Sequence, residues 1–504
     1  MKLLDKEILR LAVPSILANI TVPLVGMVDI AVAGHLHGVY PSAACIGGIS
    51  VGALLLNVIY WNCFFIRAST GGLTAQAYGR RNVAPVIADC YCQSPGDILR
   101  QSLLLSAIMA AVLLVLQWPL SRLTFIFADA TPRVAELALR YFFIRIWAAP
   151  ATIALMALKG WFIGMQDSVS SMFTDLIVNA VNIVVSIVLG LGIGGWDGIG
   201  FDGIALGTVI AQYCGLAFAA AVVAVKYRGE FGSLPGEGLS GRAMPESGSP
   251  CGTRTGPLPD AGGSGNDPSG SFRRLFTLNG DLFVRSLCFT GIYLGFTVIA
   301  AQYGETLLAC CNIMMSLLML FSYFTDGFAY AGEALTGRFI GERNPGMTRR
   351  AVGQTFVWSM GVAGVWMLIY WLGGTPLLRL MTDDATVVDA CRQFLPWLLI
   401  MPAFGCAAFT WDGIFIGATS SKAIRNAMIW ALAAFLGVWF VGKALLGAAG
   451  LPVEITPQIC NLRGPHIAGN DVYYIHLLMA AYFAHLLARA LVLTYRWRRR
   501  ILVK

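Results

Sequence analysis

Long apolar stretches recur along the chain and are separated by short polar connections. Each stretch reaches the roughly 20 residues that a helix needs to cross about 30 Å of hydrocarbon. A backbone exposed to lipid must satisfy its own hydrogen bonds, and the alternating pattern of a membrane barrel is absent, so we expect helices. The stretches occur at about twelve places: residues 8–34, 42–66, 99–120, 134–157, 169–191, 203–225, 275–300, 307–330, 351–372, 387–410, 423–447 and 472–494.

Basic residues concentrate in alternate connections. They open the chain at Lys2, Lys6 and Arg10, and they close it in the run 496–504. The intervening connections hold far fewer, so the positive-inside rule predicts that both termini are cytoplasmic. The same rule accounts for the net charge of +8 without nucleic-acid binding. The first apolar run is too long for a cleavable signal peptide and continues as a span.

The composition excludes an ordinary soluble protein. Of the 504 residues, 57% are hydrophobic and only 12% are charged, which identifies an all-α integral membrane protein. The 12 cysteines are scattered through the spans, as small core residues are. Cys90 and Cys92 form a lone CxC pair, and the histidines have no ligand spacing, so we expect neither a metal nor another cofactor.

The chain divides near its middle. Residues 229–271 are rich in Gly, Pro and Ser and almost without aromatic residues, so they cannot bury enough surface to fold. We expect a flexible cytoplasmic linker there, between an N-terminal six-helix lobe at 1–228 and a C-terminal six-helix lobe at 272–504. The role of the segments 88–98 and 448–471 is left open.

The two halves resemble copies of one unit. GLTAQAYGRRN at 72–82 aligns with ALTGRFIGERN at 334–344, and KGWFIG at 159–164 aligns with DGIFIG at 412–417. Six spans per copy place both copies the same way up, as two bundles related by a pseudo-two-fold axis along the membrane normal. Transporters of this kind bind substrate between the halves and alternate access by rocking one half against the other. A symmetric channel is the weaker alternative, because no filter-like motif is evident.

Asp29 lies in an apolar helix, within GMVDIAVAGHL at 26–36. Burying its charge in a bilayer costs at least ~2.5 kcal/mol on insertion scales, so a functional role is the first interpretation. A titratable carboxyl in this position is a candidate site for a proton or another cation.

A polar stripe in the fifth span reaches the same membrane depth as Asp29. Asn179, Asn182 and Ser186 follow Asp175 at helical spacing, and a stripe of this kind points away from lipid. We predict that Asp29 converges with three of these polar residues on one hydrated pocket, namely Asn179, Asn182 and Thr208 of the sixth span. The alternative is that the amides and the hydroxyl only form hydrogen bonds between helices. Each such bond contributes about 0.6 kcal/mol on average.

Two prolines, Pro14 and Pro23, interrupt the first span and free backbone carbonyls. They permit a helix bend during transport, with Pro14 as its expected centre. A static kink is an equal alternative, because membrane helices tolerate proline.

The second half contains its own acids, of which Asp326 and Asp412 are the candidates for function. They either help to gate the cytoplasmic side or form structural ion pairs with Arg285, Arg338 or Lys159, and we favour the ion pairs. Two further charged residues are expected at the membrane interface: Arg67 and Glu333.

A drug-binding vestibule requires aromatic and apolar side chains with few polar groups. Tryptophans in membrane proteins more often form interfacial belts or pack in the core, and this is the alternative for each candidate. The candidates are Tyr60, Trp61, Tyr141, Trp147, Met156, Gln212, Tyr323, Trp397 and Trp411.

Five motifs together resemble the multidrug and toxic compound extrusion (MATE) transporters, and among them the DinF-like branch. The motifs cover nearly the whole chain: LAVPSILANITVPLVGMVDIAVAGHL in the first span, RASTGGLTAQAYGRRN after the second, GWFIGMQDS after the fourth, FTDGFAYAGEALTG in the eighth and WDGIFIGATSS after the tenth.

The resemblance implies an antiporter that exports cationic or amphipathic small molecules in exchange for H⁺ or Na⁺. One position departs from the family pattern. Members with a well-formed cation site often carry a second acid one turn after the asparagine that matches Asn182, and here that position is Ser186. A hard cation prefers several charged oxygens, so we expect proton coupling, with sodium as the less favoured ion.

Two other function classes are weaker. A lipid-linked saccharide flippase of the same superfamily would need a denser set of cationic groups for its pyrophosphate. A membrane enzyme would need a convergent catalytic set, which is not evident. We therefore expect a monomeric multi-pass transporter of the bacterial inner (plasma) membrane, without catalytic residues, whose partners are the bilayer and small-molecule substrates.

Overall fold

The computed structural model describes residues 2–36, 41–83, 93–127, 131–231, 268–448 and 469–502. These residues are almost entirely helical, and 12 helices among them are long and apolar enough to cross a membrane. The number of spans and the all-α class predicted from the hydrophobic pattern are therefore confirmed.

The first half contains six of these spans. Two of them are built from more than one helix: α2 continues into α3, and α7 continues through a short 3-10 turn, η1, into α8. The elements are α1 (Lys2–Gly34), α2 (Ser42–Cys63), α3 (Phe65–Arg81), α5 (Pro95–Val115), α6 (Gln117–Phe127), α7 (Pro132–Arg145), η1 (Ile146–Ala148), α8 (Ala149–Gly164), α9 (Ser168–Leu191), α10 (Phe201–Lys226) and η2 (Arg228–Glu230).

The second half supplies the other six spans with longer, mostly continuous helices. They are α11 (Pro268–Ala300), followed by the turn η3 (Ala301–Tyr303), then α12 (Glu305–Gly341), α13 (Pro345–Met381), α14 (Ala385–Gly417), α15 (Ser421–Ala448) and α16 (Gly469–Ile501).

Several boundaries differ from the sequence prediction. The second span was expected to end at residue 66, but α3 extends it to Arg81, because the polar side chains beyond that point are buried in protein. The predicted linker was expected to reach residue 271, but α11 begins at Pro268, a residue favoured in the first turn of a helix. Residues 232–267 of that linker lie outside the described residues, as do 84–92 and 449–468 of the two unassigned segments. The division into lobes stays a prediction.

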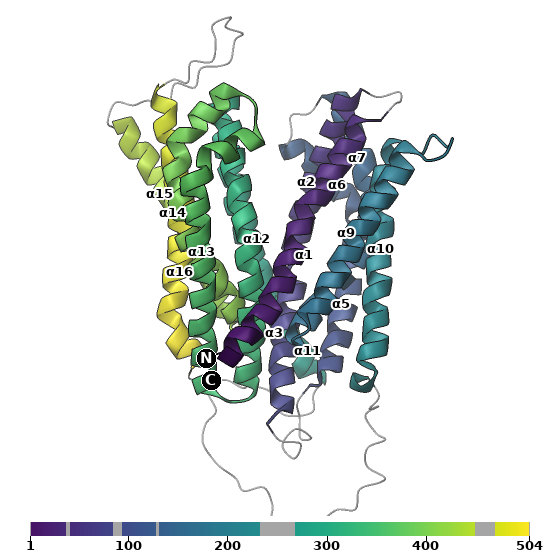
Figure 1. The fold of residues 1–504 in the computed structure, drawn as a ribbon, viewed down its shortest axis with the longest axis vertical. Coiled ribbons are helices and arrows are strands. Elements are labelled where there is room, and N and C mark those ends of the chain that lie inside the picture. Colours follow the sequence, from purple (N-terminus) through teal and green to yellow (C-terminus); the bar gives the residue numbers. More distant parts are fainter. Residues whose placement is uncertain are drawn as a thin grey trace, which may run out of the picture.

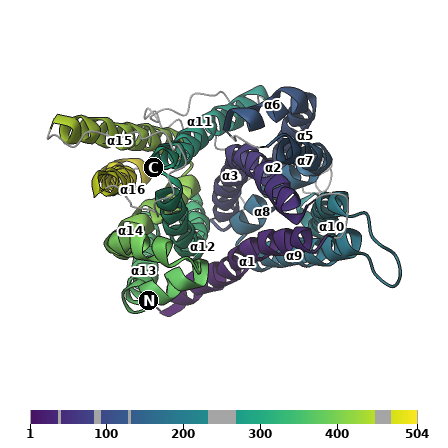
Figure 2. The same ribbon diagram turned by 90° about the horizontal axis from the view of Figure 1, so that it is seen from above.

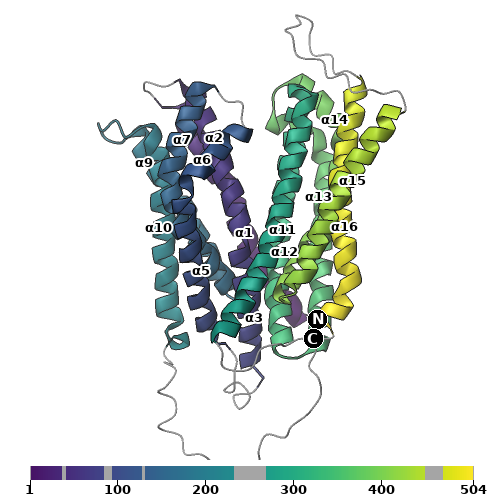
Figure 3. The same cartoon turned by 180° about the vertical axis from the view of Figure 1, so that it is seen from behind.

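The two halves lie on opposite sides of the molecule (Figures 1 and 3). They meet at the end that carries both chain termini and diverge toward the other end. The first helix of each half crosses to the opposite half, so α1 contacts α12 and α13 while α11 contacts α2 and α3. Seen from above, α1 and α11 border the molecule on opposite sides of its middle (Figure 2). Both termini therefore lie at one end, as the charge pattern requires.

The repeated motifs pack against each other at this closed end. A Cβ on Gly79 would lie 1.9 Å from the carbonyl oxygen of Arg338, and a Cβ on Gly341 would lie 2.2 Å from that of Gln76. Gly341 and Arg338 are the repeat equivalents of Gly79 and Gln76. The contact is thus reciprocal, as a two-fold axis demands, and only glycine permits the backbones to approach this closely.

Hydrogen bonds between the halves accompany the glycine contacts. Gln76 Nε2 donates to the carbonyl oxygen of Gly417 at 2.9 Å, and Gln166 Nε2 donates to that of Ala334 at 2.8 Å. The polar contacts make this end a specific interface.

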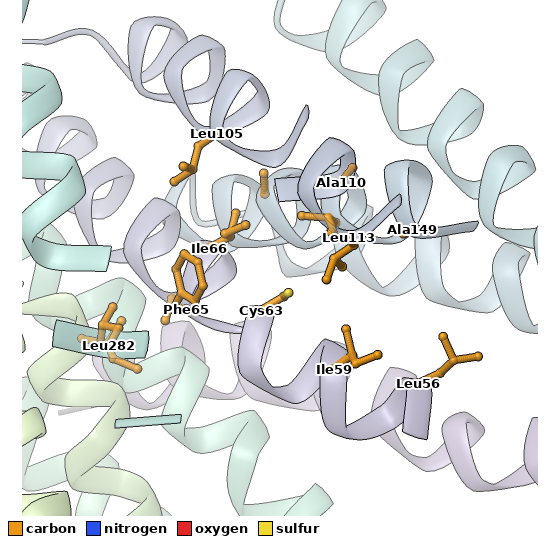
Figure 4. Close-up of a cluster of buried hydrophobic side chains, with 14 of the residues drawn as sticks. Leu56, Ile59, Cys63, Phe65, Ile66, Leu105, Ala110, Leu113, Ala149 and Leu282 are labelled. Atoms are coloured by element: carbon orange, nitrogen blue, oxygen red, sulfur yellow. The ribbon is translucent and has the colours of Figure 1, made fainter. Parts of the chain in front are cut away.

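A buried apolar cluster supports the first half from inside. Figure 4 shows side chains of α2, α3 and α5 meeting there, with Cys63 among them and Leu282 of α11 joining from the second half. The free cysteines of the described residues are buried except for Cys214, which agrees with their predicted role as small core residues.

Candidate functional site

Asp29 is buried at the contact between α1 and α9, with 4% of its surface exposed. These helices run in parallel with a constant register. Thr21 accepts a hydrogen bond from Asn179, and Val32 approaches Gly190, where a Cβ would lie 2.7 Å from the valine side chain. The register places Asp29 at the level of Ser186.

Helix α10 packs against α9 and completes the site. Asn182 Nδ2 donates to Thr208 Oγ1 at 2.9 Å. The neighbouring Gly207 lets α10 approach Ser186, since a Cβ there would lie 2.5 Å from the serine hydroxyl. Asn182, Ser186 and Thr208 therefore form the wall that faces Asp29.

Two buried oxygens at this site have no hydrogen-bond partner within the described part of the chain: Asp29 Oδ1 and Asn182 Oδ1. The Ser186 hydroxyl is the hydrogen-bonding group next to the Asp29 carboxyl. Leaving a buried polar group unsatisfied costs about 1–3 kcal/mol. The unsatisfied oxygens around one carboxyl therefore make this group the candidate site for a proton or a cation.

Asn179 is not part of this group. Its amide donates to Thr21 Oγ1. Thr21 lies eight residues before Asp29, about 12 Å at 1.5 Å per residue. Of the four residues predicted to converge, the structure brings three together, adds Ser186, and leaves Asn179 two turns away.

Arg145, which the sequence analysis missed, lies close to this site. It ends α7 in the middle of the fourth span, is half-buried, and donates to Tyr141 Oη at 2.7 Å. Its charge interacts with that of Asp29. The signal was available, because the argument from an expensive charge in an apolar run applies to Arg145 as well as to Asp29.

In the second half, Asp412 is held by two arginines. It forms ion pairs with Arg285 of α11 and with Arg489 of α16, the latter with a distance of 2.7 Å between Arg489 Nη2 and Asp412 Oδ2. The Arg285 pair was among those predicted, whereas Arg489 was not. Asp326 is half-buried and has no hydrogen bond or ion pair within the described residues, but it interacts electrostatically with Arg67 and Arg489.

The other predicted ion-pair partners are engaged elsewhere. Lys159 pairs with Asp175 at 2.8 Å, and Arg338 pairs with Glu342 at 2.9 Å. Asp175 is therefore paired with Lys159, and it lies 11 residues along α9 from Ser186, which is at the level of Asp29.

Arg67 and Glu333 are not interfacial, which corrects the prediction. They are 5% and 0% exposed and form an ion pair between α3 and α12, with 3.4 Å from Arg67 Nη2 to Glu333 Oε2. The arginine also lies over the Tyr330 ring at 3.7 Å. Gly71 makes room for the acid, because a Cβ there would lie 2.0 Å from Glu333 Oε1. The two halves thus share a buried charge pair at the closed end.

The aromatic candidates for a substrate cavity do not form one group. Tyr141 and Trp411 are buried in the core, and Trp411 Nε1 donates to Thr494, so neither ring faces open space in this structure. Trp147 is 57% exposed. The remaining candidates are half-buried: Tyr60, Trp61, Met156, Gln212, Tyr323 and Trp397. Their role in binding stays a prediction.

The first helix runs unbroken through both Pro14 and Pro23. Both prolines lie inside the first span, as predicted. Their role in a helix bend stays a prediction.

At the closed end, Asp167 caps α9 just outside the span. It accepts hydrogen bonds from Lys226 Nζ and Tyr227 Oη, each at 2.7 Å. Burial acts to raise the pKa of this carboxyl, but the hydrogen bonds from Lys226, Ser170 and Tyr227 outweigh it, and the pKa lies below its usual value. Asp167 thereby ties the start of α9 to the end of α10.

Comparison with known proteins gives consistent results. The MatE family model matches residues 14–188 and 282–441. The chain is 33% identical over 437 residues to the DNA damage-inducible protein F of Escherichia coli, covering 86% of this chain and 84% of that protein. It is 26% identical over 242 residues to the probable multidrug resistance protein NorM of Pseudomonas aeruginosa, covering 48% and 46%.

Solved structures share the fold. One of them, described as the outward-facing conformation of a multidrug resistance MATE family transporter of the MOP superfamily, superimposes with a TM-score of 0.75. The match covers 99% of this chain and 97% of that one at 16% sequence identity. The two-lobe arrangement of helices is therefore that of known transporters.

Proposed function

Because the chain belongs to the MatE family of multidrug and toxic compound extrusion transporters, we propose that it exports cationic or amphipathic molecules in exchange for protons carried by Asp29. The relatives are MATE transporters, and this chain is a transporter as they are. The coupling ion and the direction of exchange are inferred from the Asp29 site and the arrangement of the halves.

The single observation that supports a proton is the composition of the Asp29 site. It contains one carboxyl group, and its other oxygens, from Asn182 and Ser186, carry no charge. A sodium ion prefers several charged oxygens, and Asp175, the other acid on α9, is paired with Lys159. A proton needs only the one carboxylate.

The arrangement of the halves supports alternating access. They are joined at the end that holds the termini (Figure 1). Helix α1 starts at that end and runs from Lys2 to Gly34, so Asp29 lies near its far end, away from the junction. With cytoplasmic termini in a bacterial inner membrane, this structure faces outward. Return to the inward-facing state requires the glycine contacts and the Arg67–Glu333 pair to separate, as rocking of a monomer would do.

Dye accumulation in everted membrane vesicles tests the proposal, because an exporter moves dye into their lumen. A pH gradient with an acidic lumen in sodium-free medium drives accumulation by the wild type, and a sodium gradient at equal pH does not. Asp29→Asn removes the pH-driven accumulation. Asp175→Asn is the matched control, since it neutralises an acid of α9 that is paired with Lys159 outside the site, and it retains the response to the pH gradient. Accumulation that follows sodium, or that survives in Asp29→Asn, contradicts the proposal.

A further inference from the structure

Arg145 is a cation placed in the middle of a membrane span. It is the last residue of the 14-residue helix α7, and the span continues without a break to Gly164. Its side chain is half-buried. None of the ion pairs found among the described residues, with N···O distances up to 4.0 Å, includes Arg145. A cation kept at this depth without a bonded carboxylate requires an explanation.

Tyr141 holds the guanidinium in place. Arg145 Nη1 donates to Tyr141 Oη at 2.7 Å, and the guanidinium carbon lies 5.5 Å from the centre of the tyrosine ring. The ring itself is 0% exposed and is wedged against α2, where a Cβ on Gly52 would lie 2.8 Å from it. Arg145 is therefore fixed toward the interior of the first half instead of reaching along the span to water.

The carboxyl of the Asp29 site is the one whose charge interacts most directly with Arg145 within the first half. The two charges interact with each other, and both interact with Tyr141. The titratable groups of α7 whose interactions reach Asp29 are Tyr141 and Arg145, and Tyr60 of α2 interacts with Arg145 and Tyr141. Helices α9 and α10 contribute the neutral Asn182, Ser186 and Thr208. Arg145 is thus the permanent charge that acts on Asp29 within the described residues.

We propose that Arg145 sets the charge of this site and thereby selects what binds there. The inference rests on the proposed role of Asp29 as proton carrier and adds a positioning residue to it. With Asp29 ionised, the two charges balance and the site is neutral overall. With Asp29 protonated, the site carries one positive charge.

This balance has two consequences for selectivity. Sodium finds no net negative charge at the site, so it cannot replace the proton. A cationic amphipathic substrate finds a neutral site before proton binding and a repulsive one after it, and this difference is what an exporter needs to release its cargo on proton uptake.

Infrared titration of the purified full-length protein in lipid tests the inference. The carbonyl band of a protonated carboxylic acid that disappears in Asp29→Asn belongs to Asp29, and its intensity is followed with pH. A nearby cation stabilises the carboxylate, so removing that cation in Arg145→Gln moves the midpoint of the Asp29 band upward by about one pH unit. Arg145→Lys keeps the charge and stays near the wild type. Tyr141→Phe removes the hydrogen bond to Arg145 but keeps the ring and every permanent charge, so it separates loss of the hydrogen bond from loss of charge.

Binding of tetraphenylphosphonium to the same variants, kept in detergent so that the cation does not partition into lipid, gives the second measurement. Arg145→Gln leaves one net negative charge with Asp29 ionised, so its affinity for this cation rises about tenfold over the wild type, and the double variant with Asp29→Asn loses the gain. If Arg145→Gln has the wild-type midpoint and the wild-type affinity, or if Arg145→Lys behaves like it, the inference is overturned while Asp29 keeps its role. If the wild type has no Asp29-dependent band that titrates, the proposed function itself fails.

Discussion

Replacing Gly79 by alanine should open the closed end of the transporter. The added methyl group would lie 1.9 Å from the carbonyl oxygen of Arg338, and 2.8 Å from the carbonyl carbon. Both are backbone atoms, so no side chain can rotate away, and α3 and α12 must separate to accommodate it. In Gly341→Ala, the added methyl group would lie 2.2 Å from the carbonyl oxygen of Gln76, which is the equivalent contact in the other repeat. This variant should also open the closed end.

The size of the effect follows from the cost of overpacking. Inserting one methyl group into a well-packed contact costs typically 1–3 kcal/mol, and each 1.4 kcal/mol changes an equilibrium constant about tenfold. Since the state with the halves apart at this end does not contain the contact, the variant should favour that state by roughly 5- to 150-fold. Gly353→Ala is the control, because it changes an exposed glycine of α13 with nothing within 4 Å of the added carbon.

Pulsed electron spin resonance measures the population directly. Spin labels at the exposed positions Val83 and Arg349, one in each half, report the distance across the closed end. Gly79→Ala and Gly341→Ala should both enrich the longer distance, and Gly353→Ala should match the unsubstituted protein. If the folded glycine variants show the same distances as the control, the contact is not a gate and the reasoning is refuted.

Three further predictions concern charges and one amide. Glu333→Gln leaves Arg67 buried without its ion-pair partner and should lower the free energy of unfolding by about 3–5 kcal/mol. Replacing both residues by methionine should recover most of it, and equal thermal stability of the single and double variants would refute this. The lowered pKa of Asp167 means that its bonds to Lys226 and Tyr227 contribute stability above the ordinary carboxyl pKa, and this contribution is lost as the pH falls through the lower, folded-state value. Thermal melts between pH 3 and 7 should therefore show a drop at acidic pH that is smaller in Asp167→Asn, and identical pH profiles would contradict it. Asn179→Ala should keep the pH dependence of efflux, because its amide bonds to Thr21 and not to the Asp29 group; a shifted profile would return Asn179 to the site.

The large features of the fold followed from the sequence because they depend on length and pattern. A span needs about 20 apolar residues, and an even number of spans in each half places both termini at the same end. The predicted end of the second span was wrong because Arg67 and the polar residues after it resemble a solvated loop, whereas in the fold they pair with Glu333 and pack on α12. The polarity of a segment alone does not show whether its side chains contact water or another part of the protein.

The candidate site was predictable only in part. Asp29 and Asn182 could be identified because a charge or an amide in a span is costly wherever it points. The separation of Asn179 from Asp29 depends on the register between α1 and α9, which no local pattern encodes. Arg489 pairs with Asp412 across 77 residues of chain, so its partner emerged only from the packing of α14 against α16.

The central claim is that Asp29 carries the proton that drives export. The most direct test is proton movement in sodium-free proteoliposomes that hold a pH indicator in the lumen, with equal pH on both sides and a gradient of an amphipathic cation that the purified transporter binds. The wild type should move protons opposite to the cation and change the luminal pH, and Asp29→Asn should leave the luminal pH constant. A luminal pH change of the same size in Asp29→Asn, or one that requires added sodium, would contradict the account.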